Sequence, residues 1–226
     1  MTTRWTPGAA LTAAALTLLG GLVGAQEGRE PARERLVGPG APAPALAEVG
    51  EPAPDFSLLD LDGARHELSR LRGRVVVLEW FNADCPYVAK YHRSGLVRAM
   101  VRELRPRGVT WLAIASGISA ASADDLGAAA REWSIAYPIL RDRDGAIARA
   151  YRARRTPHMY VIDRDGVLRY EGALDDAPDD LTSLGERNHV LRAVGAVLDG
   201  REVEVAHTTP FGTTVSLLEV LNEDEE

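Results

Sequence analysis

The stretch Glu79-Trp80-Phe81-Asn82-Ala83-Asp84-Cys85-Pro86-Tyr87-Val88 decides the fold of this chain. An apolar run leads into the stretch, and apolar residues at spacings of three and four follow it. This pattern predicts a buried strand over residues 75–81, a short turn, and a helix over residues 87–104 that starts next to Cys85. Pro86 suits the first helical position, because a backbone N–H there has no intrahelical partner.

Cys85 is the only cysteine of the chain. A sulfur at the start of a helix lies at the positive end of the helix dipole, which favours the thiolate, the reactive form. The alternative interpretation is that Cys85 is a small apolar core residue. The strand, Cys-Pro and helix context favours a functional position.

Composition excludes some classes of function. The chain has 226 residues, of which 46% are hydrophobic and 26% charged, with a net charge of -7. These values are typical of one well-packed globular domain with extensions. An acidic chain lacks the basic surface that nucleic-acid binders carry, so no nucleic-acid partner is expected.

The first 25 residues have the pattern of a signal peptide. Arg4 supplies a positive charge, residues 9–23 are apolar and uncharged, and small residues precede a cleavage site after Ala25. An uncleaved membrane anchor is the alternative, although the apolar run is short for a span. We therefore expect an exported protein, periplasmic or extracellular, with no stable membrane span after processing. In an oxidising compartment a single thiol either pairs with another molecule or stays reactive.

The remaining chain divides into a linker, a domain and a tail. Residues 26–50 are rich in Gly, Pro and Ala and predict a flexible linker. Residues 51–200 form the predicted domain, and residues 201–226 a C-terminal extension with an acidic end. Within the domain the pattern predicts a hairpin over residues 56–68, a strand over 75–81, a helix over 87–104 and a strand over 109–115. A helix over 122–133, a short extended segment over 136–140 and a helical turn or two over 144–151 follow. Two antiparallel strands over 156–163 and 167–170 and a helix over 188–198 complete the domain.

This order and the stretch around Cys85 resemble the thioredoxin-like superfamily, in particular its redoxin branch of the alkyl hydroperoxide reductase/thiol-specific antioxidant type. The matching residues are Trp80 and Phe81 at the strand end, Cys85-Pro86, and Lys90 with Tyr91 early in the helix. The resemblance covers residues 51 to about 200. It implies an α/β, three-layer thioredoxin-like fold with a central mixed sheet flanked by helices, and an oxidoreductase with a redox-active centre and antioxidant activity.

The resemblance also implies roles for individual residues. Cys85 stands where relatives carry the attacking sulfur. Pro86 and Thr156-Pro157 stand at substrate-binding positions, the latter matching a loop with a cis-proline. Glu79 stands where thioredoxins carry a buried acid, and it is a candidate proton acceptor if burial raises its pKa. The alternatives are an ordinary strand-starting proline and a solvated or ion-paired strand glutamate.

The chain departs from the family at the resolving cysteine. The usual Cys-x-x-Cys motif reads Cys85-Pro86-Tyr87-Val88 here. Some redoxin relatives carry a second cysteine after a Gly in a later segment, and here that position is Thr213. Both positions for a resolving sulfur are therefore occupied by other residues.

Charged and metal-binding side chains add weaker signals. Cationic candidates to stabilise a thiolate are Lys90, His92, Arg93, Arg154 and Arg155. No metal and no cofactor is expected, because the His residues are scattered. A copper- or haem-type site of Cys85, His92 and His158 remains as a minor alternative.

Two reactions fit a single nucleophilic cysteine. The thiolate can attack a disulfide substrate, or it can reduce a peroxide to give a sulfenic acid. Either product needs an external thiol or a thioredoxin-type reductant as the resolving partner. Peroxiredoxins carry a Pro and a Thr at the positions of Leu78 and Asn82, so their absence weakens the peroxide reaction. The competing interpretation is a non-catalytic thioredoxin-like binding module.

Overall fold

The computed structural model describes residues 46–177 and 180–217 of the chain. The predicted signal peptide, most of the predicted linker and the acidic end lie outside the described residues. Ala47, in the predicted linker, is buried and donates its backbone N–H to the carbonyl of Ala150 at 2.8 Å.

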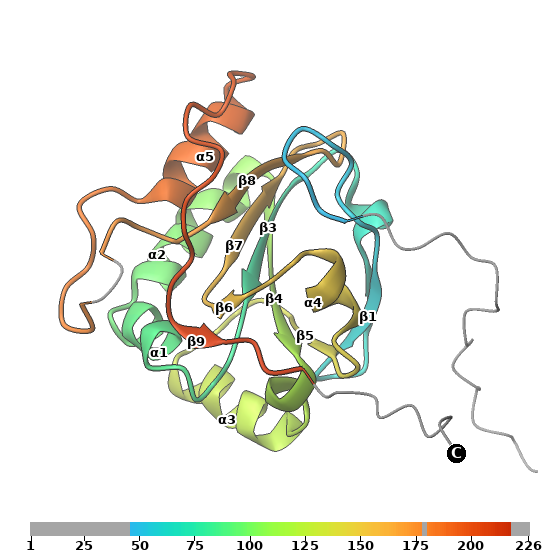
Figure 1. Ribbon diagram of the computed structural model, residues 1–226, viewed down its shortest axis with the longest axis vertical. Coiled ribbons are helices and arrows are strands. Elements are labelled where there is room, and N and C mark those ends of the chain that lie inside the picture. The colour runs from blue at the N-terminus through green and yellow to red at the C-terminus, as the bar shows by residue number, and fades with distance from the viewer. Residues whose placement is uncertain (1–45, 178–179, 218–226) are drawn as a thin grey trace, which may run out of the picture. The chain divides into compact units, whose positions relative to one another are not determined.

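A mixed seven-stranded sheet forms the centre of the domain (Figure 1). Its strands lie in the order β2-β1-β5-β4-β3-β7-β8. Their bounds are β1 Ser57–Asp60, β2 Arg65–Glu67, β3 Val75–Trp80, β4 Val109–Ser116, β5 Ile139–Asp142, β7 Met159–Ile162 and β8 Leu168–Gly172. β3, β4 and β5 are parallel, whereas β1, β2, β7 and β8 join through antiparallel pairs. The predicted α/β class with a mixed sheet is therefore confirmed.

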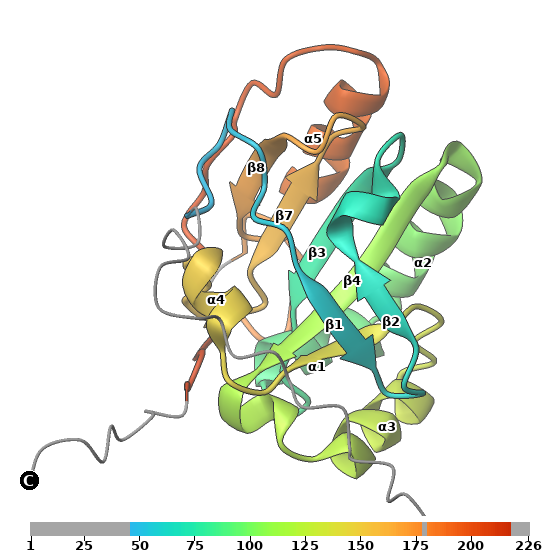
Figure 2. The ribbon, with the colours of Figure 1, turned by 90° about the vertical axis from the view of Figure 1, so that its right-hand side faces the viewer.

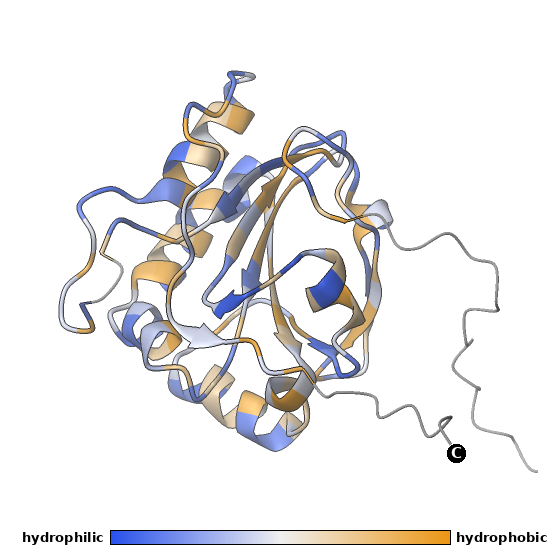
Figure 3. Ribbon diagram, viewed as in Figure 1, coloured by the Kyte–Doolittle hydropathy of each residue, from blue (hydrophilic) through white to orange (hydrophobic). Residues whose placement is uncertain are grey.

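Two apolar layers cover the sheet, because alternate residues of β3 point to opposite faces. Val75 and Val77 pack in one layer with α2 (Leu96–Leu104) and α5 (His189–Leu198). Val76, Leu78 and Trp80 pack in the other layer, which includes α4 (Ala146–Ala150). Figure 2 shows α4 on the opposite side of the sheet from α2 and α5, and Figure 3 shows hydrophobic residues along the central strands.

The remaining helices are short. They are α1 (Pro86–Arg93), α3 (Ala123–Glu132) and three short 3₁₀ turns, η1 (Leu68–Leu71), η2 (Arg105–Arg107) and η3 (Gly117–Ala120). Residues of α1 and α3 form a further apolar cluster. Ser122 caps α3, because its hydroxyl accepts the backbone N–H of Asp125 at 3.1 Å, and the helix starts where the predicted range 122–133 starts. None of the helices in the described part of the chain is long and apolar enough to cross a membrane.

The helix predicted over residues 87–104 is wrong in one respect: the structure has two helices, α1 and α2. The break falls at Gly95, which has φ of +78° and stands at the N-cap of α2. A left-handed residue cannot continue a right-handed helix, and glycine adopts this conformation at low cost. The break separates α1, which starts just after Cys85, from α2, which packs in the apolar layer with α5.

The strand predicted over residues 156–163 is also divided. Arg155–Thr156 forms β6, and β7 starts after Pro157. β6 leaves the main sheet and pairs with β9 (Thr213–Thr214) near the C-terminal end. In the predicted C-terminal extension, an isolated bridge joins His207 to Glu171.

Candidate active site

Cys85 lies at the junction between β3 and α1. The turn before it is closed by Asn82, whose carbonyl oxygen accepts the N–H of Cys85 at 3.1 Å and whose side chain accepts the N–H of Asp84 at 2.9 Å. Cys85 is the N-cap of α1, and Pro86 occupies the first helical turn. The sequence therefore predicts correctly how the sulfur is presented at the start of the helix.

The sulfur of Cys85 contacts the loop that carries the cis-proline. Its S–H donates to the carbonyl oxygen of Thr156 at 2.8 Å, and the Thr156–Pro157 peptide bond is cis. Cys85 and Thr156 are 0% and 2% exposed. The structure thus brings together Cys85, Pro86, Thr156 and Pro157, four of the five predicted site residues.

This contact describes a resting thiol. A thiolate has no hydrogen to donate, so its lone pairs would face those of the Thr156 carbonyl oxygen. Attack on a substrate therefore requires that the sulfur move away from this carbonyl or that the carbonyl move away from the sulfur.

Glu79, the fifth predicted residue, belongs to a separate buried cluster. Its carboxylate is 1% exposed and accepts three hydrogen bonds. The donors are Nε2 of His92 at 2.8 Å, Nε1 of Trp111 at 3.0 Å and the hydroxyl of Tyr137 at 2.9 Å. We call these four residues the Glu79 cluster.

The Glu79 cluster reverses the pKa shift on which the proton-acceptor role depends. Burial alone raises the pKa of a carboxyl, but the adjacent imidazole of His92 and the three hydrogen bonds outweigh burial. They hold the pKa of Glu79 below its ordinary value. The carboxylate is therefore stabilised as an anion, and the expected rise does not occur.

Sequence reasoning missed the partners of Glu79. His92 also stacks on Trp133, with ring centroids 5.3 Å apart and an interplanar angle of 25°. One signal was available, since a lone acid in a buried apolar strand needs donors on the same face of the sheet. Trp111 lies on the neighbouring strand β4, two residues from the register partner of Glu79.

The predicted cations take partners other than the sulfur. Lys90 donates to the carbonyl oxygens of Asp180 at 2.6 Å and Ala177 at 3.3 Å. Arg93 forms an ion pair with Glu132 at 2.9 Å. Among the residues that the structure describes, none of the candidate cations forms a hydrogen bond or ion pair with Cys85.

The minor metal-site alternative is not supported. His158 lies beside Pro157, and its Nδ1 is 2.9 Å from the hydroxyl of Tyr160. Burial, with a smaller effect from Arg154, lowers the pKa of His158 from 6.5 to about 3. His92 is held by Glu79, and residues 46–177 and 180–217 contain no group of three side chains placed to hold a metal ion.

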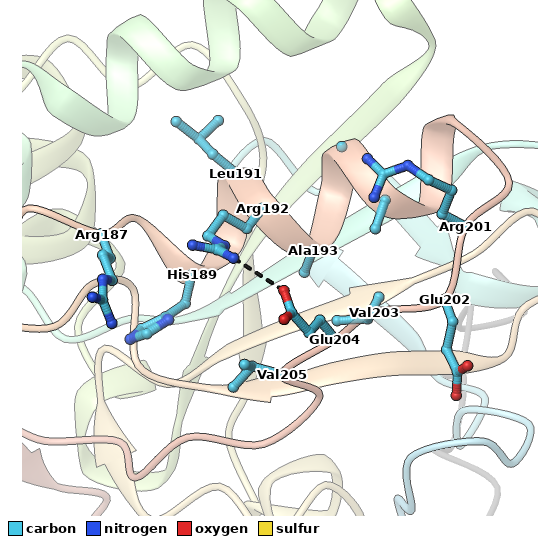
Figure 4. A pocket seen from close by; sticks show the side chains of 12 residues that line it. Arg187, His189, Leu191, Arg192, Ala193, Arg201, Glu202, Val203, Glu204 and Val205 are labelled. Atoms are coloured by element: carbon cyan, nitrogen blue, oxygen red, sulfur yellow. Dashed lines mark hydrogen bonds and ion pairs between the residues drawn. The ribbon is translucent and has the colours of Figure 1, made fainter.

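A surface hollow of about 470 Å³ lies apart from the sulfur (Figure 4). It is lined by α5 and by residues 201–205, and an ion pair of 3.2 Å joins Arg192 to Glu204 across it. None of the predicted site residues lines this hollow.

Comparison with known proteins points to the same region of the chain. Residues 49–171 match the family described as AhpC/TSA. The thiol-disulfide oxidoreductase ResA of Geobacillus kaustophilus is 29% identical over 121 residues, which cover 54% of this chain and 67% of the relative.

Two solved structures have the same fold. A protein of Geobacillus kaustophilus described as an uncharacterized conserved protein is 27% identical, with a TM-score of 0.69, over 81% of this chain and 99% of that chain. A thiol:disulfide interchange protein of the thioredoxin family from Chlorobium tepidum is 22% identical, with a TM-score of 0.50, over 66% of this chain and 96% of that chain. The second likeness shows the fold alone.

Proposed function

Because this chain belongs to the AhpC/TSA family, we propose that it is an exported thiol-disulfide oxidoreductase with one nucleophilic cysteine, Cys85. One observation carries the proposal: the sulfur lies at the N-cap of α1 and 2.8 Å from the carbonyl of the residue before a cis-proline. The N-terminus of α1 favours negative charge, which suits a sulfur that reacts as thiolate. The similarity to a named thiol-disulfide oxidoreductase supports the same class of reaction.

The reaction needs two exchange steps. The Cys85 thiolate attacks one sulfur of a substrate disulfide, which forms a mixed disulfide and releases the other sulfur as a thiolate. An external thiolate then attacks the substrate sulfur of the mixed disulfide, which releases Cys85 and leaves the substrate joined to the external thiol. No cofactor takes part in this proposal, and the external thiol replaces the resolving cysteine that the chain lacks.

Residues around Cys85 have separate roles in the proposal. Thr156 and Pro157 present backbone groups to the substrate, and Pro86 starts the helix that holds the sulfur. For Glu79 we propose a positioning role in place of proton transfer, because its carboxylate holds His92 in the last turn of α1 at 2.8 Å.

A second candidate function is a non-catalytic binding module. The observation that favours it is the complete burial of Cys85, which is 0% exposed and belongs to an apolar cluster with Phe81, Val88 and Leu126. In that case Cys85 fills space in the core and the loop at Pro157 serves recognition alone.

One experiment separates these candidates. The mature protein is mixed with an asymmetric aromatic disulfide, and intact mass and thiolate release are followed against pH, with Cys85→Ser as the control. We expect one mixed disulfide per chain and a released thiolate that the Cys85→Ser variant does not produce. If the folded protein forms no adduct until it is denatured, both as the full mature chain and as a chain ending at His207, the result favours the binding module instead.

The peroxide reaction is tested in the same preparation. Peroxide is added before a reagent that traps sulfenic acids, and the adduct is measured by mass. We expect slower reaction with peroxide than with the disulfide, because Leu78 and Asn82 replace the Pro and Thr that peroxiredoxins carry. If Cys85 reacts faster with peroxide than with the disulfide, peroxide reduction is the favoured activity instead.

A further inference from the structure

Residues 208–217, which we call the C-terminal strap, contact two parts of the candidate site, β6 and the start of α1. At one end, the hydroxyl of Thr208 accepts the N–H of Ala173 at 2.8 Å. At the other end, the carbonyl of Ser216 accepts the N–H of Ile118 at 3.2 Å. Figure 1 shows β9, the middle of the strap, running beside β6 near the start of α1.

The strap binds the loop that contacts the sulfur. Thr213 pairs with Thr156 and Thr214 pairs with Arg155 in the antiparallel register of β9 and β6. The guanidinium of Arg155 donates to the hydroxyl of Thr214 at 2.7 Å. This edge of β6 is therefore occupied, and no other strand can pair at the same edge while the strap is bound.

Gly212 brings the strap against the carbonyl that holds the sulfur. It has φ of +113°, and a Cβ at this position would lie 2.1 Å from the oxygen of Thr156. That oxygen is the acceptor of the Cys85 S–H. The two contacts share one atom, so a shift of this loop at Gly212 changes the environment of the sulfur.

The strap has fewer buried side chains than the core, although Val215 and Leu217 pack in part against the core. Phe211 is its one buried side chain, and the ring packs on Tyr87 of α1 with centroids 5.7 Å apart. β9 has two residues, and Thr214 and Ser216 are exposed. A short segment with few buried contacts opens without unfolding the sheet.

We propose that the C-terminal strap is an autoinhibitory segment, and that Cys85 reacts only when the strap leaves β6. Displacement frees the edge of β6 for a strand of the substrate and lets the Thr156 carbonyl move away from the sulfur. This inference rests on the proposed function for its meaning, because it describes how that site is regulated.

The test compares two glycine variants. Gly212→Ala places a methyl group against the Thr156 carbonyl, whereas Gly200→Ala adds one at φ of +67° with no atom within 4 Å. Both variants strain a left-handed backbone, but only the first displaces the strap. The readout is the rate at which iodoacetamide alkylates the folded protein, which reports Cys85 alone because the chain has no other cysteine.

We expect alkylation at least tenfold faster for Gly212→Ala and within twofold of the parent for Gly200→Ala. An unchanged rate for Gly212→Ala overturns the proposal, and so does an equal rise in both variants, because a general loosening then explains it. If Gly212→Ala fails to fold, a chain ending at His207 replaces it. Faster alkylation of this shorter chain supports the proposal, whereas an unchanged rate or loss of the fold, measured by circular dichroism, overturns it.

The same variants separate this inference from the proposed function. If Gly212→Ala alkylates faster but forms no mixed disulfide with the aromatic disulfide, the strap is a cover and the oxidoreductase proposal fails. If the parent forms the mixed disulfide rapidly and Gly212→Ala is no faster in either reaction, the oxidoreductase proposal stands and the strap proposal fails.

Discussion

Two polar groups lie near the C-terminal end of β3, Glu79 within the strand and Cys85 just after it, and their surroundings differ. The carboxylate of Glu79 accepts hydrogen bonds from three side chains on α1, β4 and the segment before β5. The sulfur of Cys85 donates one hydrogen bond to a backbone carbonyl. Both groups are buried, yet the carboxylate is held by three side chains and the sulfur by a single backbone carbonyl.

The difference separates stability from reactivity. A buried charge with three donors resists any change of its surroundings, because each broken hydrogen bond leaves a polar group without a partner. A sulfur with one weak hydrogen bond loses little when that bond breaks. We therefore expect the Glu79 cluster to contribute more to the stability of the fold, and the region around Cys85 and the cis-proline loop to contain the reactive group.

The largest expected effect is a contrast between two truncations. Glu79→Ala leaves His92, Trp111 and Tyr137 without their shared acceptor and should lower the free energy of unfolding by about 3–5 kcal/mol. Cys85→Ala removes one sulfur atom and should cost about 1 kcal/mol. Urea unfolding followed by circular dichroism measures both values. Equal costs for the two variants would contradict the division between the two groups.

The second effect is a pH dependence of the free energy of unfolding, caused by His158 next to the cis-proline. The pKa of His158 is about 3 in the folded protein against an ordinary 6.5, so the unfolded chain binds a proton between these values and the folded chain does not. The free energy of unfolding therefore falls as pH falls through this window. His158 should contribute a loss of about 2 kcal/mol between pH 7 and pH 5.

Unfolding curves at both pH values test this contribution. His158→Asn removes the imidazole, so the variant should lose less stability than the parent over the same pH interval. The other groups that titrate are common to both proteins and cancel in the comparison. The same pH dependence in parent and variant would show that His158 is protonated as easily in the folded protein as in the unfolded chain.

The smallest effect tests whether the Glu79 cluster acts as a unit. Trp111 and Tyr137 both donate to Oε2 of Glu79. Trp111→Phe and Tyr137→Phe each remove one of these donors and should each cost about 1–2 kcal/mol. The double variant leaves Oε2 without either donor, so its cost should exceed the sum of the single costs. Additive costs would mean that the two donors stabilise the fold independently.

The sequence predicts most of the fold because its elements have strong local patterns. Residues 75–78 are apolar without interruption, as in a strand buried on both faces, and β3 is buried throughout, Glu79 included. Ser122 and Asn188 are residue types that favour the N-cap position, and both cap helices in the structure. The division of the helix at Gly95 was missed, because one glycine is compatible with a continuous apolar period.

The candidate site was predicted less completely, because its partners come from distant parts of the chain. Cys85 and Thr156 are 71 residues apart, and only the resemblance to a family predicts that they lie close together. Nothing local marks Tyr137 as a donor to Glu79 or Gly212 as a neighbour of Thr156. These contacts depend on how the sheet and the strap are arranged, which periodicity along one segment does not encode.

The anchoring of Lys90 has a practical consequence. Its ammonium is held by the carbonyl oxygens of Asp180 and Ala177, and no other lysine occurs in the chain. An acylating reagent therefore has one side-chain amine to react with. We expect that amine to react when it has left the loop carbonyl oxygens of Ala177 and Asp180. The extent of labelling at a single residue becomes a gauge of how often this loop detaches from α1, read by mass without any engineered probe.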